Sequence, residues 1–298
     1  GPTPAPHAVE AVRAGGGEVI DAGAGVDGLV WLSPHDAEGL RHVLEADPGI
    51  GWVQLPFAGV EAFAATGMLA DGRRWTSAKG SYAEPVAEHA LALALAGLRH
   101  LPERIAARSW GRPKGTSLYD ADVTILGGGG ITEKLLEQLA PFRARVTVVR
   151  RNPTPLAGAA RTVPTAQLHE VLPGALVVFL ALALTPETRG IIGAPELELM
   201  DPTAWLVNVA RGGHVVTDAL VAALRAGTIG GAAVDVTDPE PLPDGHPLWE
   251  LPNALVTPHT ADWPEVVDEL FARRISANVR HLAAGEELEG AVDPVAGY

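Results

Sequence analysis

The chain has 298 residues with no cysteine, 47% hydrophobic residues and a formal net charge of −14. The lack of cysteine excludes disulfides, thiolate metal sites and a cysteine nucleophile. The acidic charge repels phosphate backbones and argues against nucleic acid as a partner, while the length and apolar content suffice for two domains with a large buried core.

Short β-type segments alternate with helical stretches in the N-terminal third of the chain. The pattern predicts a helix over 8–14, strands over 18–21, 28–32 and 50–55, and helices over 36–45 and 59–69. Such alternation is typical of a parallel sheet covered on both faces. A unit of this kind normally begins with a strand, so either a first strand is missing from the N-terminus or the sheet is one strand short.

A second alternating region follows a helix predicted over 84–100, whose nearly all-apolar middle indicates burial, plausibly between two domains. A polar loop rich in glycine and proline covers 108–119. The pattern then predicts strands over 123–126, 145–149, 176–180, 204–208, 231–236 and 253–257, and helices over 131–139, 165–171, 195–200 and 218–226. A long helix over 264–285 completes the pattern.

No segment of the sequence indicates a membrane or an export signal. Gly1–Pro6 contains neither the basic nor the apolar region of a signal peptide. The longest apolar run, Leu172–Leu184, is too short to cross a bilayer and is interrupted by Pro173 and Gly174. We therefore expect a cytoplasmic protein with no membrane partner. In so acidic a chain, an anionic substrate would need a local basic anchor.

A glycine-rich turn follows the strand predicted over 123–126. Gly127 allows a tight turn, Gly129 lets the backbone approach a pyrophosphate, and Gly130 and Ile131 begin a helix whose N-terminus faces the anion. Thr132 occupies the third glycine position of this fingerprint, so helix and strand are expected to pack less closely. The turn predicts a dinucleotide site; in a chain with 34 glycines, an ordinary loop is the alternative.

The residues after the next strand bear on the choice of dinucleotide. Enzymes that use NAD usually place an acidic residue there to hold the ribose hydroxyls, whereas this chain has Arg150 and Arg151. Two arginines suit a 2′-phosphate. The sequence therefore favours NADP over NAD, the alternative being that both arginines simply lie in water.

Further motifs occur in order between about positions 80 and 263. They are Pro85-Val86-Ala87-Glu88-His89, Leu184-Thr185-Pro186-Glu187-Thr188-Arg189-Gly190, Asn208-Val209-Ala210-Arg211-Gly212, Ala233-Val234-Asp235-Val236, Pro239-Glu240-Pro241-Leu242-Pro243 and Thr257-Pro258-His259-Thr260. Together they resemble the D-isomer-specific 2-hydroxyacid dehydrogenase family. The resemblance implies two doubly wound parallel-sheet α/β domains: a Rossmann cofactor domain (99–264) inserted in a flavodoxin-like substrate domain (1–98 plus 265–298). It also implies a homodimer joined through the cofactor domains.

The resemblance assigns three catalytic residues, and the chemistry explains their types. Reduction of a keto acid needs a proton donor at the carbonyl oxygen, and an imidazole suits because it titrates near neutral pH. By resemblance the donor is His259, and Glu240 stabilises its imidazolium. Arg211 anchors the substrate carboxylate and polarises the carbonyl. Taken singly, each residue also fits a non-catalytic interpretation: Arg211 as a surface arginine, Glu240 as an exposed acid and His259 as a loop histidine.

The remaining assignments also rest on the resemblance. The cofactor contacts are completed by Thr185, Ala210 and Asp235, of which Asp235 is expected to bind the nicotinamide carboxamide or else to cap a turn. The backbone amides of Ala58, Gly59 and Val60 are expected to receive the substrate carboxylate, and Tyr82 and Trp263 either shape the substrate pocket or pack in the core. His89 is interpreted as structural, and no metal site is expected because no helical pair of histidines has ligand spacing.

These observations predict an NAD(P)-dependent dehydrogenase that transfers a hydride between a nicotinamide and a small anionic 2-keto or 2-hydroxy acid of the D series. Glu240 argues against formate dehydrogenase, which pairs its histidine with glutamine. Arg150 and Arg151 favour reductases of the glyoxylate or hydroxypyruvate type. The alternatives are a non-catalytic, NAD(P)-sensing corepressor-like protein and a dehydrogenase of another anion such as phosphite. Arg211, Glu240 and His259 together argue against the sensor, which needs no proton relay.

Overall fold

The protein is described from a computed structural model, which describes residues 4–20 and 25–294. The chain forms two compact units. Unit 1 consists of Gly1–Tyr82 and Asp262–Tyr298, and unit 2 consists of Ala83–Ala261.

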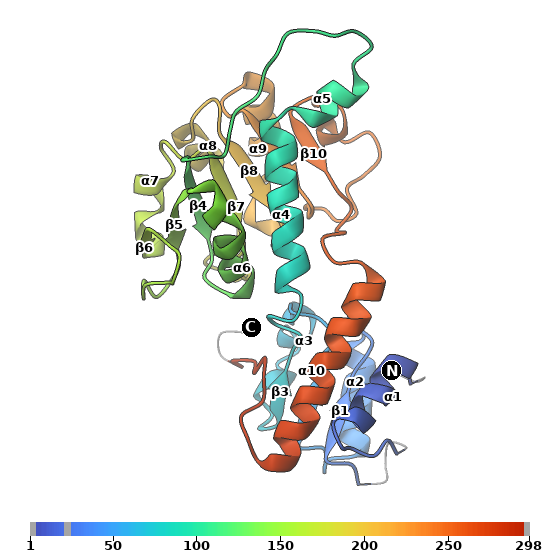
Figure 1. Cartoon of the computed structure of the whole chain (residues 1–298). Coiled ribbons are helices and arrows are strands. Elements are labelled where there is room, and N and C mark those ends of the chain that lie inside the picture. The colour runs from blue at the N-terminus through green and yellow to red at the C-terminus, as the bar shows by residue number, and fades with distance from the viewer. Residues whose placement is uncertain (1–3, 21–24, 295–298) are drawn as a thin grey trace. The chain divides into compact units, whose positions relative to one another are not determined.

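Unit 2, all of whose residues are described, contains a seven-stranded parallel sheet (Figure 1). Its strands are β4 (Asp122–Leu126), β5 (Arg145–Val149), β6 (Arg161–Val163), β7 (Val177–Leu180), β8 (Trp205–Asn208), β9 (Gly231–Val234) and β10 (Ala254–Val256). They lie in the order β10-β9-β8-β7-β4-β5-β6, which reverses direction between β4 and β7. This reversal is the topological switch point of a doubly wound, Rossmann-type sheet, beside which ligands bind in such folds.

Helices cover both faces of this sheet. They are α4 (Ala83–Leu98), α6 (Gly130–Leu139), α7 (Leu168–Val171), α8 (Ala194–Leu199) and α9 (Thr217–Ala226). The short α5 (Leu101–Ala106) follows α4 and buries none of its residues. Side chains alternate between faces along a strand. Leu206 belongs to the core shared with α7, α8 and α9, whereas its neighbour Trp205 lies under Gly97 of α4. The strands β7, β8 and β9 are buried along their whole length, as a sheet covered on both faces requires.

The boundary between the units differs from the one expected at residue 98. The whole of α4 belongs to unit 2, because it packs against α6, β8 and β9. Gly97 approaches the Trp205 indole so closely that a Cβ at Gly97 would overlap the ring. The second crossing lies after Ala261, close to the boundary expected at 264.

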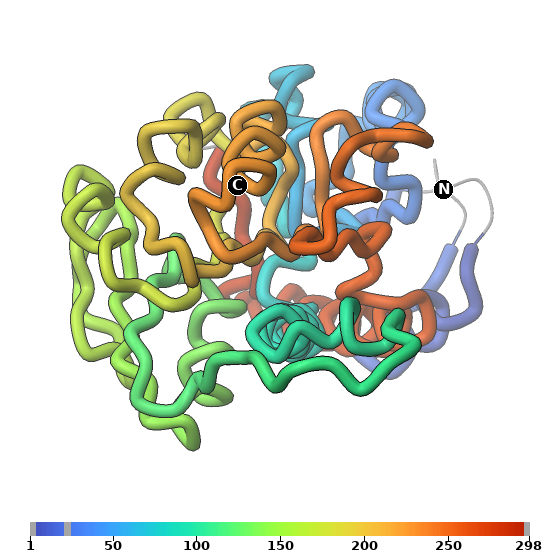
Figure 2. Tube along the Cα trace, turned by 90° about the horizontal axis from the view of Figure 1, so that it is seen from above, coloured from blue at the N-terminus to red at the C-terminus, as the bar shows by residue number. Residues whose placement is uncertain are grey.

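After α5 the chain leaves regular structure. Residues 107–121 contain no helix or strand and run along one side of unit 2, which Figure 2 shows with α4 seen end-on. Three large apolar side chains are exposed on α5 and residues 107–117: Leu101 is 44% exposed, Ile105 77% and Trp110 97%. We call α5 and residues 107–117 the arm.

In its described part, unit 1 contains a parallel sheet in the order β1-β2-β3. Its strands are β1 (Gly28–Val30), β2 (Trp52–Gln54) and β3 (Arg74–Thr76), and its helices are α1 (Pro6–Ala14), α2 (Ala37–Ala46), α3 (Glu61–Ala64) and α10 (Pro264–Ala284). Leu40, Leu55 and Phe63 are almost completely buried in its core. Of the strand expected over 18–21, residues 18–20 lie in no strand, and residue 21 lies outside the described residues.

A buried polar network ties α10 to the sheet of unit 1. Asn278 donates from Nδ2 to Oε1 of Gln54 (2.8 Å) and accepts at Oδ1 from the backbone of Glu289 (2.8 Å). Thr76 donates to the same Gln54 oxygen (2.9 Å) and accepts from the Trp52 indole (2.8 Å). The buried side chains of this network, Trp52, Gln54, Thr76 and Asn278, are therefore all hydrogen-bonded, as burial demands.

Candidate active site

The loops after the strands of unit 2 leave the sheet along one aligned edge. The register pairs the last residues of neighbouring strands in the row Val149, Leu126, Leu180, Asn208, Val234 and Val256. Every site residue that the sequence places in unit 2 comes after a member of this row. The parallel register therefore gathers residues from positions 127 to 259 at the carboxyl edge of the sheet, where open α/β sheets bind ligands.

His259 and Glu240 are in direct contact at this edge. Nδ1 of His259 lies 2.6 Å from Oε1 of Glu240, and the two side chains are 45% and 42% exposed. An ionised carboxylate only accepts hydrogen bonds, so the bonded Nδ1 carries the proton, and any proton exchanged with a ligand would have to pass through Nε2. The pair has the composition and distance of a histidine general acid supported by a carboxylate.

Arg211 is held by its backbone in the loop after β8. Its carbonyl oxygen accepts from Nδ2 of the buried Asn208 (2.9 Å), and its N–H donates to Nδ1 of the buried His214 (3.2 Å). The next residue, Gly212, approaches the Thr237 carbonyl so closely that a Cβ would overlap it. The arginine segment is thereby packed against the loop that carries Glu240. The guanidinium is partly exposed and donates from Nη1 to the Ala210 carbonyl (2.7 Å).

The glycine turn after β4 has the form needed to receive a dinucleotide. Gly127 has a φ of 113° and lies against the Ala181 carbonyl. A Cβ at Gly129 would meet nothing within 4 Å, and this residue is the N-cap of α6 with no side-chain cap of its own. The N-terminus of α6 therefore presents free backbone donors beside open space, which fits the pyrophosphate of a dinucleotide.

Thr132 occupies the third glycine position of the fingerprint, and the helix and strand have room for its side chain. It is completely buried, and its hydroxyl donates to the carbonyl of Gly127 (3.1 Å). The hydroxyl satisfies a carbonyl of the turn, a contact that a glycine could not make.

Arg150 lies beside the glycine turn. Its side chain is so close to Gly128 that a Cβ added to that glycine would lie 2.8 Å from Cδ and Nε of Arg150. Arg151 is exposed. The pKa of Glu187 is lowered mainly by a hydrogen bond from Thr185 and to a smaller extent by the positive charge of Arg151. Both arginines thus lie at the edge of the sheet that carries the turn.

Asp235, directly after β9, is turned into the protein. It is 2% exposed, and its carboxylate accepts from the hydroxyl of Thr257 and from the backbone N–H groups of Thr260 and Ala261. Burial alone would raise its pKa, but the hydrogen bonds from His89, Thr257 and these amides outweigh burial and lower it. Asp235 therefore caps the turn at Thr260 and Ala261, which is the role that the sequence suggested as the alternative to binding the nicotinamide carboxamide.

Thr185 and Ala210 follow β7 and β8. The backbone N–H of Thr185 donates to Oγ1 of Thr188 (2.8 Å), and the N–H of Ala210 donates to Oδ1 of Asn208 (3.0 Å). Side chains of their own loops therefore fix both backbones at the carboxyl edge.

The substrate residues expected from unit 1 differ in burial. Ala58 is exposed, Gly59 is half-buried, and Val60 is buried at the N-cap of α3. Tyr82 is 6% exposed, donates its hydroxyl to the Pro56 carbonyl (2.8 Å), and has a pKa raised mainly by burial. Trp263 is 46% exposed at the N-cap of α10. Tyr82 therefore packs in the core of unit 1, and Trp263 does not.

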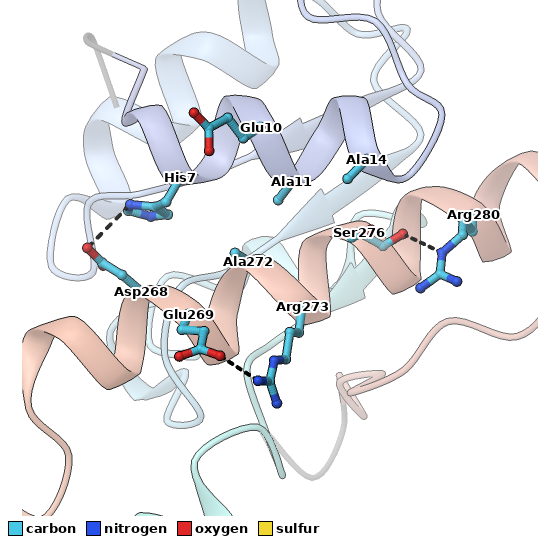
Figure 3. Close-up of a pocket in the computed structure, with 10 residues that line it drawn as sticks. All are labelled: His7, Glu10, Ala11, Ala14, Asp268, Glu269, Ala272, Arg273, Ser276 and Arg280. Carbon is cyan, nitrogen blue, oxygen red and sulfur yellow. Dashed lines mark hydrogen bonds and ion pairs between the residues drawn. The ribbon is translucent and has the colours of Figure 1, made fainter.

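A groove on unit 1 is a separate feature (Figure 3). It lies between α1 and α10, with Ala11 and Ala272 in its lining and an ion pair between His7 and Asp268 (3.4 Å) at its edge. It contains none of the residues that the sequence predicts for the site. Within residues 4–20 and 25–294, no cluster of three potential metal ligands and no helix capable of spanning a membrane is found.

Sequence reasoning missed two contacts of Asp235. His89 from α4 and Thr257 both contact Asp235, whereas His89 was interpreted from the sequence only as a structural residue. The signal available in the sequence was that both residues belong to the motifs that carry the family resemblance.

Comparisons with known proteins agree with this geometry. A sequence model described as D-isomer specific 2-hydroxyacid dehydrogenase, NAD binding domain, matches residues 90–261, which is more than half of the chain. An uncharacterized protein in the proB 3′ region of Corynebacterium melassecola is 43% identical over 256 residues, covering 84% of each chain. Glyoxylate/hydroxypyruvate reductase A of Photorhabdus laumondii is 30% identical over 282 residues, covering 91% of this chain and 87% of that protein.

A solved structure extends the likeness over both units. It is a D-isomer specific 2-hydroxyacid dehydrogenase from Xanthobacter autotrophicus in complex with NADPH and MES, 31% identical, with a TM-score of 0.84 over 98% of this chain and 95% of that chain. The Rossmann-type sheet, its glycine turn and these matches lead to one conclusion: the chain belongs to the D-isomer specific 2-hydroxyacid dehydrogenases, a family of nicotinamide-dependent oxidoreductases.

Proposed function

We propose that the protein reduces a small 2-keto acid of the glyoxylate or hydroxypyruvate type to the corresponding 2-hydroxy acid, in the D configuration where the product is chiral, with NADPH as the preferred cofactor. The observation that carries this proposal is the 2.6 Å contact between His259 and Glu240 at the edge of the sheet that also bears Arg211 and the glycine turn. The name of the Photorhabdus relative supports the substrate class.

Each residue of the trio has a distinct chemical role in this proposal. NADPH, when bound at the glycine turn, would supply a hydride for the carbonyl carbon of the substrate. His259 gives the proton on Nε2 to the carbonyl oxygen, and Glu240 stabilises the imidazolium before that transfer. Arg211 binds the substrate carboxylate and polarises the carbonyl through its guanidinium. In the reverse direction, His259 removes the hydroxyl proton.

The cofactor contacts are assigned to the carboxyl edge of unit 2. Gly127, Gly129, Gly130 and Ile131 form the pyrophosphate turn, and Thr185, Ala210 and Asp235 complete the contacts from the following loops. Asp235 is included in this set although its side chain is 1% exposed and its carboxylate bonds Thr257, Thr260 and Ala261. Its Oδ2, which accepts from the Ala261 amide, would be the acceptor for a carboxamide N–H once the loop makes room.

The preference for NADPH is assigned to Arg150 and Arg151. Arg150 lies against the glycine turn, and no carboxylate follows β5 to hold ribose hydroxyls or to repel a 2′-phosphate. The NADPH bound to the Xanthobacter structure supports this preference.

Unit 1 is assigned to the substrate. Ala58, Gly59 and Val60 are proposed to receive the carboxylate through backbone amides, and Trp263 is proposed to shape the side-chain pocket. Tyr82 would act from within the core by holding the chain at Pro56.

We also propose that two copies associate through unit 2. The arm exposes Leu101, Ile105 and Trp110 within a short stretch, and contiguous exposed apolar side chains are typical of an association surface.

The test of the proposed function is NADPH and NADH consumption, followed by absorbance, with glyoxylate, hydroxypyruvate, pyruvate and longer 2-keto acids. We expect turnover with a short keto acid and faster turnover with NADPH. Cofactor binding without turnover of any acid would favour a sensor of the corepressor type, and reduction of NADP by phosphite alone would favour the other anion.

A further inference from the structure

The backbone of His259 adopts an unfavourable conformation. Its φ is 51°, in the left-handed region that residues with a side chain seldom occupy. Two hydrogen bonds hold its N–H, one to the Asp235 carbonyl (2.8 Å) and one to the Thr257 carbonyl (3.0 Å). A conformation of this kind persists only where the surroundings over-determine it. The question is therefore what fixes residues 257–261, which we call the His259 loop.

The carboxylate of Asp235 holds this loop through hydrogen bonds to Thr257, Thr260 and Ala261. Oδ1 accepts from the hydroxyl of Thr257 (2.5 Å) and from the N–H of Thr260 (2.9 Å), and Oδ2 accepts from the N–H of Ala261 (3.1 Å). These donors stand on both sides of His259 in the sequence. One buried carboxylate thus spans the loop and sets the direction in which the His259 ring leaves it.

His89 contacts both members of this support from a different element. Its Nε2, on α4, lies 3.1 Å from Oγ1 of Thr257 and 3.3 Å from Oδ1 of Asp235. The Thr257 hydroxyl donates its only proton to Asp235, so it can only accept a hydrogen bond from His89. The carboxylate of Asp235 is an acceptor as well. Nε2 must therefore carry the proton, and His89 donates to the hydroxyl and the carboxylate.

The donor matters because the carboxylate has no access to water. The side chain of Asp235 is 1% exposed, and that of His89 is 22% exposed. A buried carboxylate that loses a donor cannot replace it with solvent and must regroup its remaining partners. Those partners are the groups that fix the His259 loop, so a change at His89 reaches His259 through Asp235 and Thr257.

We propose that His89 is a positioning residue for the reduction: its Nε2 proton fixes Asp235 and Thr257 so that the His259 loop holds the imidazole on Glu240. This inference rests on the proposed function for its effect on turnover. The restraint that His89 places on the His259 loop through Asp235 and Thr257, which we call the clamp, can be measured without turnover. His89 touches neither substrate nor cofactor in this role.

The experiment compares two replacements of His89 in the full chain. His89→Leu removes the donor and keeps an apolar side chain on α4, whereas His89→Gln places an amide N–H near the position of Nε2. The matched control is His169→Leu, because His169 also bonds a carboxylate through Nε2 (2.7 Å to Glu196) but is exposed on α7, outside the site. Thr257→Val removes the linking hydroxyl at nearly constant shape and replaces His89→Leu if that variant does not fold.

The first readout is amide hydrogen exchange of the protein without ligand. In His89→Leu we expect the amides of Thr260 and Ala261, which donate to Asp235, to exchange about tenfold faster than in the wild type. His89→Gln and His169→Leu should exchange like the wild type. The second readout is steady-state reduction of the best keto acid found. We expect kcat to fall about tenfold in His89→Leu, since small misplacements of a reacting group have effects of this order. KM for the keto acid should stay within about twofold, and His89→Gln should recover most of kcat.

Equal exchange in His89→Leu and His169→Leu would overturn the clamp. Faster exchange with unchanged kcat would overturn the positioning role, and so would a His89→Gln variant as slow as His89→Leu. If the wild type reduces no 2-keto acid, the proposed function is overturned, and the exchange rates alone then support or overturn the clamp.

Discussion

Gly127 and Gly129 lie two residues apart in the same turn, but the structure predicts opposite consequences for adding one methyl group to each. At Gly127 the φ of 113° disfavours any residue with a Cβ, and that Cβ would overlap the carbonyl of Ala181 in the loop after β7. At Gly129 the φ is −99°, and a Cβ would meet nothing within 4 Å. Gly127→Ala is therefore expected to damage the fold, and Gly129→Ala the cofactor site.

The magnitudes follow from these two environments. A residue with a side chain at an unfavourable positive φ costs about 1–3 kcal/mol, and overlap that forces backbone shifts costs about 1–3 kcal/mol. Gly127→Ala should therefore lower the free energy of unfolding by about 2–6 kcal/mol, a large part of what a typical domain possesses. Gly129→Ala should change it by less than about 1 kcal/mol, because the new methyl group meets no atom.

Thermal unfolding and NADPH binding separate the two effects. We expect Gly127→Ala to lower the melting temperature by at least about 4 °C, from the smaller of these costs. Gly129→Ala should unfold at the wild-type temperature but raise the NADPH dissociation constant by about tenfold or more, because its methyl group occupies the space assigned to the pyrophosphate. A Gly127→Ala variant as stable as the wild type would refute the reasoning about the turn. A stable Gly129→Ala variant that binds NADPH normally would refute the assignment of the pyrophosphate.

Four further predictions address the site and the surface. His259→Ala should reduce keto-acid turnover at least about 100-fold while leaving the NADPH dissociation constant unchanged; turnover equal to the wild type would exclude the proposed proton donor. Arg150→Asp should shift the ratio of NADPH to NADH efficiency about tenfold or more towards NADH, and an unchanged ratio would contradict the cofactor assignment. Because the pKa of Asp235 is lowered below 3.8, its ionised form stabilises the native state above that pH, and this contribution disappears as pH falls through the lowered pKa. Chemical unfolding at several pH values should therefore give an Asp235→Asn variant that is less stable than the wild type near neutral pH, with a smaller difference in acid. Trp110→Lys should shift the protein towards monomers in sedimentation equilibrium, and a wild type that is already monomeric would contradict association through the arm.

The sequence predicted features whose signals are local. The apolar runs that became β7 and β8, the glycine turn after β4 and the amphipathic helices each carry their pattern within about ten neighbouring residues. The order of the motifs also identified the family, and this prediction is confirmed by the match of residues 90–261 to the sequence model of the family's NAD binding domain. By contrast, strands β3 and β6 and helix α5 were not predicted. Strands β3 (Arg74-Trp75-Thr76) and β6 (Arg161-Thr162-Val163) each begin with arginine and contain a threonine, so they lack the apolar run that marked the other short strands, and α5 has only six residues.

Contacts between distant residues were decided only by the tertiary structure. The alignment of six strand ends at one edge brings Glu240 to His259 across 19 residues, and it brings Asp235 to Thr257 across 22. His89 reaches Thr257 across 168 residues, and no local pattern distinguishes this histidine from one that only fills space. The boundary between the units was also decided there, because Gly97 and Trp205 meet through the close approach of α4 to the sheet. The physical reason is common to all of these contacts: a residue type records what a side chain can do, whereas register and helix packing determine which other side chain it meets.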